Sequence, residues 1–229
     1  GGEPLLHPDF WKINDSLKER SFRSILNSNG ILIDEEAAQK SSFDEIQISL
    51  DGMKDGHEVL RGKGTFKKAI AAIKASIKAG KDVSVATMVH SKNINEFNEM
   101  EKLLKELGVI AWIIDVPVAE GRLKENLQFY PPLRGYLKDI LEKQFGSEVH
   151  ESSGDYICGA HLASVQASGS LTKCGFYEEW SGGSVKNGLR EAWKKLPKMK
   201  LNELSCECPI LEECRGGCRY RAEVYYDGD

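Results

Sequence analysis

Residues 83–116 read VSVATMVHSKNINEFNEMEKLLKELGVIAWIIDV, and this stretch decides the fold that we expect for the chain. Val83 to Val89 is rich in β-branched residues and predicts a strand. Asn93 to Leu107 predicts an amphipathic helix that ends at Gly108, because its apolar side chains recur at helical spacing. Those side chains are Phe97, Met100, Leu104 and Leu107. Val109 to Val116 is an almost unbroken apolar run, which is typical of a parallel strand covered on both faces.

The alternation of strand and helix continues toward the N-terminus. Ser21 to Leu26 and Glu45 to Leu50 each predict a strand, and turn-forming residues follow both. A short helix, Asp34 to Lys40, begins at a capping residue. A longer helix, Thr65 to Gly80, has an apolar face made by Phe66, Ile70, Ile73 and Ile77. This series of βα units predicts an α/β fold with a parallel sheet or barrel.

Polar or conformationally special residues lie at the predicted strand ends. They are Gly1 to Pro4, Asn27 to Gly30, Ser49 to Gly52, Thr87 to Asn93 and Pro117 to Arg122. Each segment on its own is typical of a turn. Ligands of parallel α/β folds bind at the carboxyl ends of the strands, so together these segments predict the rim of a binding site.

The composition is that of an ordinary globular protein with a sizeable core. The 229 residues are 41% apolar and 29% charged, with a formal net charge of −4 and a pI of about 5.8. A nucleic-acid binder usually carries a basic excess, so we expect no nucleic-acid partner. The absence of a signal peptide or a membrane-length apolar run predicts a cytoplasmic protein without a membrane partner. The chain begins on Gly1 rather than Met, so we expect a fragment of a longer protein.

All the cysteines lie in one stretch near the C-terminus. They are Cys158, Cys174, Cys206, Cys208, Cys214 and Cys218. Clustered thiolates are ligands for zinc and for iron–sulfur clusters, and spacing alone leaves both alternatives open. Disulfides are disfavoured, because a chain of this length needs no staples to hold a core. A predicted helix from Pro131 to Phe145 precedes the stretch, so we expect one domain at residues 1–150 and a cysteine-rich one at 151–229.

Two separated motifs resemble those of one enzyme family. Residues 1–4, Gly-Gly-Glu-Pro, resemble the GGEP motif of radical SAM enzymes, and a βα series follows it as in that family. The pattern C-x10-G-x4-C from Cys158 and the pattern C-x5-C-x3-C from Cys208 resemble the two halves of the SPASM pattern. The chain is therefore similar, over essentially its whole length, to a radical SAM enzyme with a C-terminal SPASM domain.

The resemblance implies a partial (β/α)6 TIM-like barrel, truncated at its first strand, followed by a small cysteine-rich iron–sulfur domain. In this family a [4Fe–4S] cluster on a C-x3-C-x2-C loop binds the amino and carboxylate groups of S-adenosylmethionine. Electron transfer then yields a 5′-deoxyadenosyl radical, which abstracts hydrogen from the substrate. An electron donor such as flavodoxin or ferredoxin is implied as a partner. No C-x3-C-x2-C loop occurs in residues 1–229, so we expect this fragment to be inactive in isolation.

The resemblance also implies which residues bind S-adenosylmethionine. Glycines in the GGEP loop let the backbone approach a ligand closely. Ser49 resembles a position that contacts the ribose or the carboxylate, and Arg61 resembles an arginine that pairs with the carboxylate. The full implied set is Gly1, Gly2, Glu3, Pro4, Asn29, Ser49 and Arg61. No catalytic acid or base is assigned.

The cysteines are implied as ligands of two auxiliary [4Fe–4S] clusters. The family pattern assigns Cys158, Cys174 and Cys218 to the first. It assigns Cys206, Cys208 and Cys214 to the second. Cys206 departs from the pattern, because the family places two residues between this cysteine and the next and this chain places one.

The implied function is an enzyme that modifies a peptide or protein side chain through a 5′-deoxyadenosyl radical. Two alternatives stay open. The enzyme could act on a haem or tetrapyrrole precursor or on another small molecule. The cysteine-rich tail could instead be a zinc-binding interaction module without radical chemistry.

Overall fold

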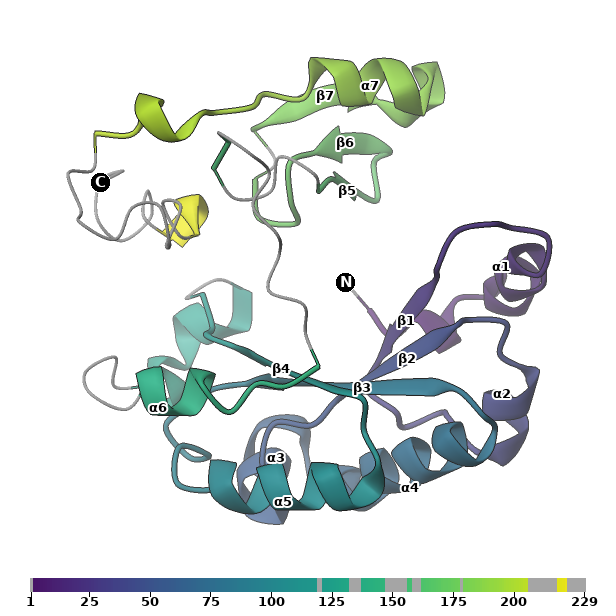
Figure 1. Ribbon diagram of the computed structural model, residues 1–229, viewed down its shortest axis with the longest axis vertical. Helices are drawn as coiled ribbons and strands as arrows, with labels where there is room; N and C mark the ends of the chain where they lie inside the picture. The colour runs from purple at the N-terminus through teal and green to yellow at the C-terminus, as the bar shows by residue number, and fades with distance from the viewer. Residues whose placement is uncertain are drawn as a thin grey trace. The chain divides into compact units, whose positions relative to one another are not determined.

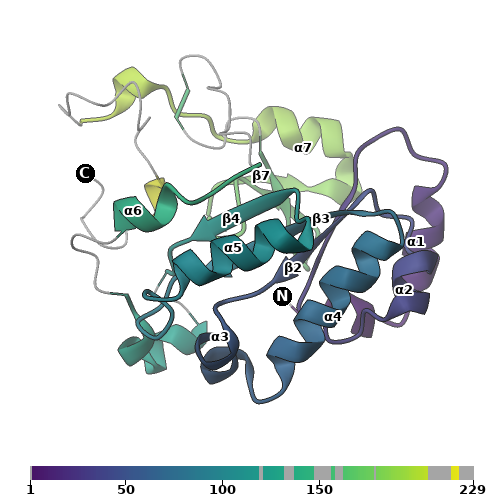
Figure 2. The same cartoon turned by 60° about the horizontal axis from the view of Figure 1, so that its bottom comes forward.

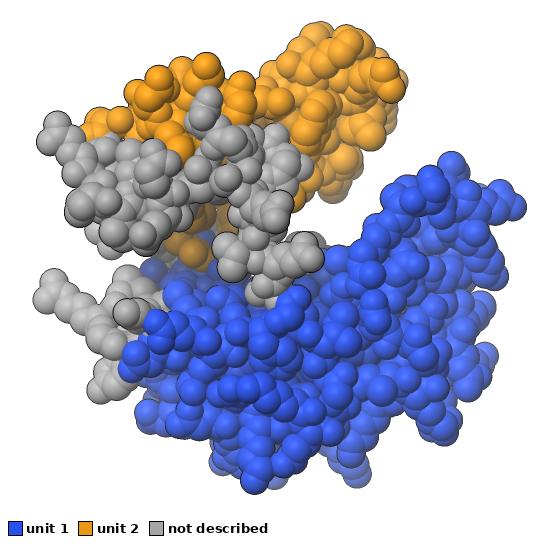
Figure 3. All heavy atoms as spheres, in the orientation of Figure 1, with its two compact units in different colours: residues 1–147 blue, residues 148–229 orange. Residues whose placement is uncertain are grey.

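The structure, a computed structural model shown in Figure 1, describes residues 2–118, 121–131, 137–146, 156–157, 162–177, 179–205 and 218–221. The chain divides into two compact units, Gly1–Ser147 and Glu148–Asp229, which Figure 3 colours separately. Within the described ranges each unit has its own sheet. None of the described helices is long and apolar enough to cross a membrane.

The first unit is built on a parallel sheet with the strand order β1-β2-β3-β4. Its strands are β1 (Ile25–Ser28), β2 (Glu45–Ser49), β3 (Asp82–Met88) and β4 (Ala111–Asp115). Its α-helices are α1 (Phe10–Leu17), α2 (Glu35–Lys40), α3 (Lys54–Arg61), α4 (Thr65–Lys78), α5 (Phe97–Leu107) and α6 (Leu137–Leu141). Three short 3-10 helices are η1 (Pro4–Leu6), η2 (Gly121–Glu125) and η3 (Leu127–Phe129). The predicted parallel α/β architecture is confirmed.

Helices α3, α4 and α5 lie along one face of this sheet, as two views of the molecule show (Figures 1 and 2). Helix α4 packs on β2 and β3, and its deepest side chains are those of Ala69, Ala72 and Ile73. The other members of its predicted apolar face, Phe66, Ile70 and Ile77, are partly buried beside this core. Ala69 and Ala72 are small, so they let the helix approach the sheet closely.

Helix α5 confirms the predicted apolar face, with Phe97, Met100 and Leu104 buried. It begins at Phe97 rather than at the predicted Asn93. The reason is that the Asn93 amide Nδ2 donates to the carbonyl oxygens of Asp51 and Met88, at 2.7 and 2.9 Å. This side chain therefore closes the loop after β3 instead of starting the helix.

Two predicted boundaries near the first and last strands are wrong. The strand predicted at Ser21–Leu26 runs from Ile25 to Ser28, because Ser24 is held to the Asp44 carboxylate through its N–H and its hydroxyl, at 2.7 and 2.8 Å. The helix predicted to reach Phe145 ends at Leu141, and residues 132–136 of it lie outside the described residues. Phe145 instead accepts a hydrogen bond from the backbone N–H of Trp112 in β4, at 2.8 Å.

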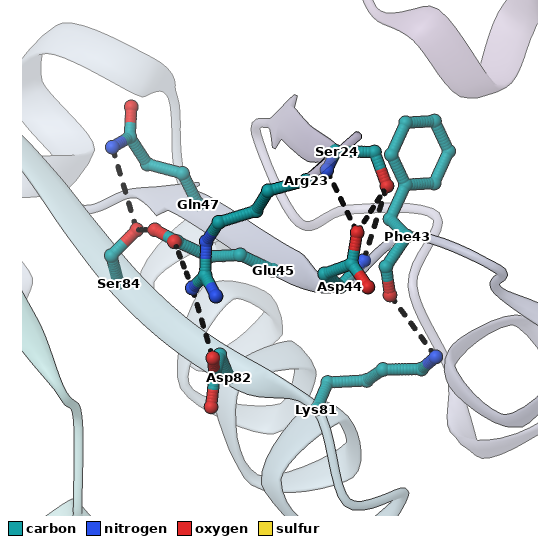
Figure 4. A network of polar contacts seen from close by, with 9 residues as sticks. All are labelled: Arg23, Ser24, Phe43, Asp44, Glu45, Gln47, Lys81, Asp82 and Ser84. Atoms are coloured by element: carbon teal, nitrogen blue, oxygen red, sulfur yellow. Dashed lines mark hydrogen bonds and ion pairs between the residues drawn. The ribbon is translucent and has the colours of Figure 1, made fainter. Parts of the chain in front are cut away.

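A polar network ties the amino ends of the strands together (Figure 4). The Arg23 guanidinium spans from the Glu45 carboxylate at the start of β2 to the Asp82 carboxylate at the start of β3, at 2.9 Å from each. Glu45 is buried and also accepts a hydrogen bond from the Ser84 hydroxyl. The network lies at the sheet edge opposite to the carboxyl ends, where parallel folds keep their ligand sites.

The second unit contains a small antiparallel sheet in the order β5-β6-β7, with α7 against it. Its elements are β5 (Ser164–Val165), β6 (Ser170–Thr172), β7 (Ser181–Ser184), η4 (Val185–Asn187), α7 (Leu189–Lys195) and η5 (Leu201–Glu203). The helix predicted from Val185 to Leu196 is split, because Gly188 between η4 and α7 has a φ of 111°, outside the helical region. Leu171, Ala192 and Leu196 form a small apolar core.

Candidate functional site

Glu3 joins the N-terminal loop to the carboxyl end of β1. Its Oε1 accepts a hydrogen bond from the Ser28 hydroxyl at 2.8 Å, and its Oε2 accepts one from the Asn29 backbone N–H at 2.9 Å. Pro4 begins η1 directly after it, and Gly2 is exposed. Both carboxylate oxygens of Glu3 are thus engaged by the protein, so this side chain fixes the loop beside the strand end. Gly1 lies outside the described residues.

Gly30 follows Asn29 in a left-handed conformation with a φ of 76°. A Cβ at this position would lie 3.1 Å from the Ala72 Cβ and 3.2 Å from the Ile48 Cγ2. Only glycine adopts this conformation and this close approach without strain. The chain therefore turns sharply at the end of β1, and the Asn29 Oδ1 accepts a hydrogen bond from the Ile31 N–H at 2.8 Å within that turn.

Ser49 and Arg61 both belong to the segment around the carboxyl end of β2. Ser49 is the last residue of β2, and its hydroxyl makes no hydrogen bond to any described residue. Arg61 is the last residue of α3, the helix that returns after β2. The Arg61 Nε donates to the Asp51 carboxylate, and the Arg61 side chain remains 34% exposed. Its terminal nitrogens donate to none of the residues that the structure describes.

Helix α3 was not predicted from the sequence, and Glu96 explains how its first turn is held. The Glu96 Oε2 accepts a hydrogen bond from the Met53 N–H at 2.8 Å, and its Oε1 accepts one from the Gly56 N–H at 3.2 Å. The carboxylate at the start of α5 therefore caps α3 from another helix, where Met53, the N-cap residue, offers no side-chain bond. Burial raises the pKa of the Glu96 carboxyl, against the opposing effect of these two bonds.

Two buried histidines contact the backbone of Asp51 in this segment. His57 and His90 are each 1% exposed, and burial lowers the pKa of both imidazoles. His57 Nδ1 accepts a hydrogen bond from the Asp51 N–H at 3.0 Å. His90 Nε2 lies 3.1 Å from the Asp51 carbonyl oxygen, to which it can only donate, and His90 Nδ1 accepts a hydrogen bond from the Lys92 N–H at 3.3 Å. Both rings are therefore neutral parts of the framework.

The structure describes part of the binding-site rim that was predicted from the segments at the strand ends. Segments 27–30, 49–52 and 87–93 lie at the carboxyl ends of β1, β2 and β3, and direct hydrogen bonds join the last two. Ala119 and Glu120, in the fifth predicted segment, lie outside the described residues. Sequence reasoning missed Asp51 and Glu96 as site residues. The available signal for Asp51 was an acidic residue directly after a strand, which we interpreted as a turn.

The donor set fits S-adenosylmethionine as a ligand. An anchored guanidinium with open terminal nitrogens suits a carboxylate, and the free Ser49 hydroxyl lies on the adjoining strand end. The structure brings together Glu3, Pro4 and Asn29 around β1, and places Ser49 and Arg61 around β2.

In the second unit, Cys174 and Cys218 are the cysteines that the structure describes, and neither is in a disulfide. Aromatic contacts join their segments. The Phe176 ring stacks on the Tyr220 ring with centroids 5.3 Å apart, and the Tyr177 ring meets the Tyr220 ring edge-on at 5.5 Å. Two partly exposed free thiols on joined segments suit an iron–sulfur cluster or zinc. Cys158, Cys206, Cys208 and Cys214 lie outside the described residues.

Comparison with known proteins matches the first part of the chain to one family model. Residues 1–106 match the model of the radical SAM superfamily. The chain is 25% identical to the AdoMet-dependent heme synthase of Methanosarcina barkeri, over 97% of this chain and 76% of that protein. It is also 25% identical to the mycofactocin maturase MftC of Mycolicibacterium smegmatis, over 95% of this chain and 64% of that protein.

A solved structure shares the fold. It is that of native anSMEcpe with bound AdoMet, which superposes with a TM-score of 0.66 and 23% identity, over 96% of this chain and 73% of that chain. The likeness confirms the predicted partial TIM-like α/β fold.

Proposed function

Because residues 1–106 of this chain match the model of the radical SAM superfamily, we propose that the carboxyl ends of β1 and β2 bind S-adenosylmethionine for radical chemistry. The superfamily uses S-adenosylmethionine and a [4Fe–4S] cluster as its cofactors. When bound together, these groups supply hydrogen abstraction by a 5′-deoxyadenosyl radical. The chain's own contribution is to hold the ligand in place at the strand ends.

The observation that carries this proposal is the state of Arg61. Its Nε is bonded to a buried carboxylate, while its terminal nitrogens make no hydrogen bond to described residues. A guanidinium held in this way offers two parallel donors to the carboxylate of the methionine moiety. The Ser49 hydroxyl adds a third donor from the neighbouring strand end. Glu3 ties the N-terminal loop to the end of β1, and the backbone of Gly1 and Gly2 in this loop is the part that we propose faces the ligand.

We propose that residues 151–229 form a SPASM-like domain that holds auxiliary iron–sulfur clusters, and that residues 1–150 form the core domain. Cys174 and Cys218 would hold one cluster together with Cys158. The contacts of Tyr220 with Phe176 and Tyr177 support this grouping, because they keep two of the three ligand segments together. The other set would be Cys206, Cys208 and Cys214. An electron donor such as flavodoxin or ferredoxin would reduce the clusters.

The substrate that we propose is a peptide or protein side chain. The support comes from the mycofactocin maturase, to which the chain is similar over 95% of its length. A tetrapyrrole is the second candidate, because the heme synthase of Methanosarcina barkeri is equally similar, at 25% identity. The two candidates differ in size and chemistry, so a direct binding comparison separates them.

The test uses protein expressed from its complete reading frame and reconstituted anaerobically with iron and sulfide. With S-adenosylmethionine and dithionite, it should release 5′-deoxyadenosine. A reconstituted protein with full iron content that releases none would overturn the proposal. Stoichiometric zinc without iron uptake would favour the interaction module instead. Addition of a tetrapyrrole precursor or of candidate peptides should then raise the release of 5′-deoxyadenosine for one substrate class only.

A further inference from the structure

Asp51 has a partner at every polar atom, and it is 1% exposed. Its Oδ1 accepts a hydrogen bond from the Met88 N–H at 2.8 Å, and its other carboxylate oxygen accepts one from the Arg61 Nε. Its N–H donates to His57 Nδ1 at 3.0 Å. Its carbonyl oxygen accepts from His90 Nε2 at 3.1 Å and from Asn93 Nδ2 at 2.7 Å. Asp51 is therefore a rigid point between the ends of β2 and β3.

The charge balance around Asp51 makes Arg61 its counter-ion. His57 presents an unprotonated nitrogen to Asp51, and His90 Nδ1 accepts a hydrogen bond from the Lys92 N–H, so neither ring brings a positive charge to the carboxylate. Asn93 and the Met88 N–H are neutral donors. A buried carboxylate without a cation is strongly unfavourable, so Asp51 holds the guanidinium firmly. The Asp51 carboxylate is thus shared between the Arg61 guanidinium and the Met88 N–H.

The point of attachment decides where the guanidinium faces. The five N–H donors of arginine lie in one plane, so a bond at Nε restricts that plane and leaves available the terminal N–H groups that point away from Asp51. The other end of α3 is fixed as well, because Glu96 holds the Met53 and Gly56 N–H groups. Both ends of this eight-residue helix are therefore tied by carboxylates from outside it.

From this geometry we propose that Asp51 is a positioning residue that aims the Arg61 guanidinium at the carboxylate of S-adenosylmethionine. The proposal rests on the proposed function, since it takes S-adenosylmethionine as the ligand. It assigns a role in ligand binding to a buried residue that makes no contact with the ligand itself. Loss of the Asp51 charge should release Arg61 and weaken the binding of any ligand that depends on its carboxylate.

The test is equilibrium binding to the anaerobically reconstituted protein without reductant, so that no turnover occurs. Two probes are used: S-adenosylmethionine, and 5′-methylthioadenosine, which lacks the amino-acid carboxylate. Asp51→Asn keeps an acceptor for the Met88 N–H but turns an amide toward the Arg61 Nε. Loss of one charge-assisted hydrogen bond corresponds to about a 10- to 100-fold weaker affinity for S-adenosylmethionine. The affinity for 5′-methylthioadenosine should stay within about twofold of wild type.

Two further variants keep the proposal falsifiable. Arg61→Lys keeps a cation beside Asp51 but removes the planar fork, so it should weaken S-adenosylmethionine binding as Asp51→Asn does, and the double variant should bind no more weakly than either one. Arg23→Ala removes an ion pair at the opposite sheet edge (Figure 4) and should change neither affinity.

Four outcomes would contradict the proposal or the function on which it rests. Wild-type affinity of Asp51→Asn for S-adenosylmethionine would overturn the proposal, as would an equal loss for both probes, which indicates a purely structural ion pair. If Asp51→Asn does not fold, Arg61→Lys with unchanged affinity for S-adenosylmethionine would overturn it. If the wild-type protein binds neither probe, the proposed function itself fails, so the two failures are distinguishable.

Discussion

Gly56→Ala should destabilise the wild-type protein but stabilise the Glu96→Ala variant. A Cβ at position 56 would overlap the Glu96 carboxylate, and the three nearest atoms to it all belong to that side chain. In the wild-type background the substitution therefore displaces the cap of α3. A Glu96→Ala background lacks these three atoms, and alanine stabilises a helix by about 0.5–1 kcal/mol relative to glycine.

The size of the wild-type effect follows from the two hydrogen bonds. Each bond from Glu96, at 2.8 Å to the Met53 N–H and 3.2 Å to the Gly56 N–H, contributes about 1 kcal/mol. Glu96→Ala should therefore lower the free energy of unfolding by about 2 kcal/mol, which is at the upper end for a lost N-cap. For a chain of this length that corresponds to a fall in Tm of about 4–8 °C. Gly56→Ala alone should lower the free energy of unfolding by about 1–2 kcal/mol, because the gain in helix propensity offsets part of the loss of the two hydrogen bonds.

The assay is urea unfolding of the four proteins of this cycle, followed by tryptophan fluorescence. Glu99→Ala is the matched control, because Glu99 is an exposed glutamate in the first turn of α5 and it should change stability by less than about 0.5 kcal/mol. If Gly56→Ala destabilised both backgrounds equally, or stabilised the wild type, Glu96 would not be the cap of α3.

Three further predictions follow from particular residues. Gly30→Ala should lower the free energy of unfolding in urea by about 2–4 kcal/mol, because the added Cβ meets a left-handed φ and crowds against Ala72. Gly80→Ala has a φ of 75° but nothing within 4 Å of the added Cβ, so it should cost about 1–2 kcal/mol, and equal costs for the two variants would contradict the crowding at Gly30. Burial raises the pKa of Glu96, so between the ordinary glutamate pKa and the raised one the folded chain keeps a proton that the unfolded chain has lost. The stability of the wild type should therefore fall relative to that of Glu96→Gln as pH rises through this window, and a constant difference in stability would contradict the raised pKa. Cys174→Ala and Cys218→Ala should each lower the iron content of the reconstituted protein by the same amount, and unchanged iron would remove both thiols from the ligand set.

The sequence was informative where periodicity and turn chemistry act locally. The buried face of α5 follows from helical spacing, and Gly80 and Gly108 end α4 and α5 as their positions predict. Helix α3 escaped prediction because its stability comes from elsewhere. It contains Gly56 in its first turn, and that turn is capped by Glu96, a residue of a distant segment. No local pattern reports a cap of that kind.

The candidate site likewise contains residues that local sequence patterns predict and residues that depend on distant partners. The segments at the strand ends could be named from sequence, since glycine, serine and proline mark those turns. Asp51 could not be distinguished from an ordinary turn residue, because its importance lies in partners that come from α3, from the end of β3 and from the loop after β3. Its contacts with Met88, His90 and Asn93 exist only once β2 and β3 lie side by side.

The central claim is that Arg61, held by Asp51, binds the carboxylate of S-adenosylmethionine at the carboxyl end of β2. A crystal structure of the anaerobically reconstituted protein with S-adenosylmethionine tests this most directly. It should show the ligand carboxylate within about 3 Å of the terminal nitrogens of Arg61, with the Arg61 Nε still bonded to Asp51 and the Ser49 hydroxyl in reach. A ligand bound with its carboxylate away from Arg61, or an Arg61 that has left Asp51 to reach it, would contradict the account.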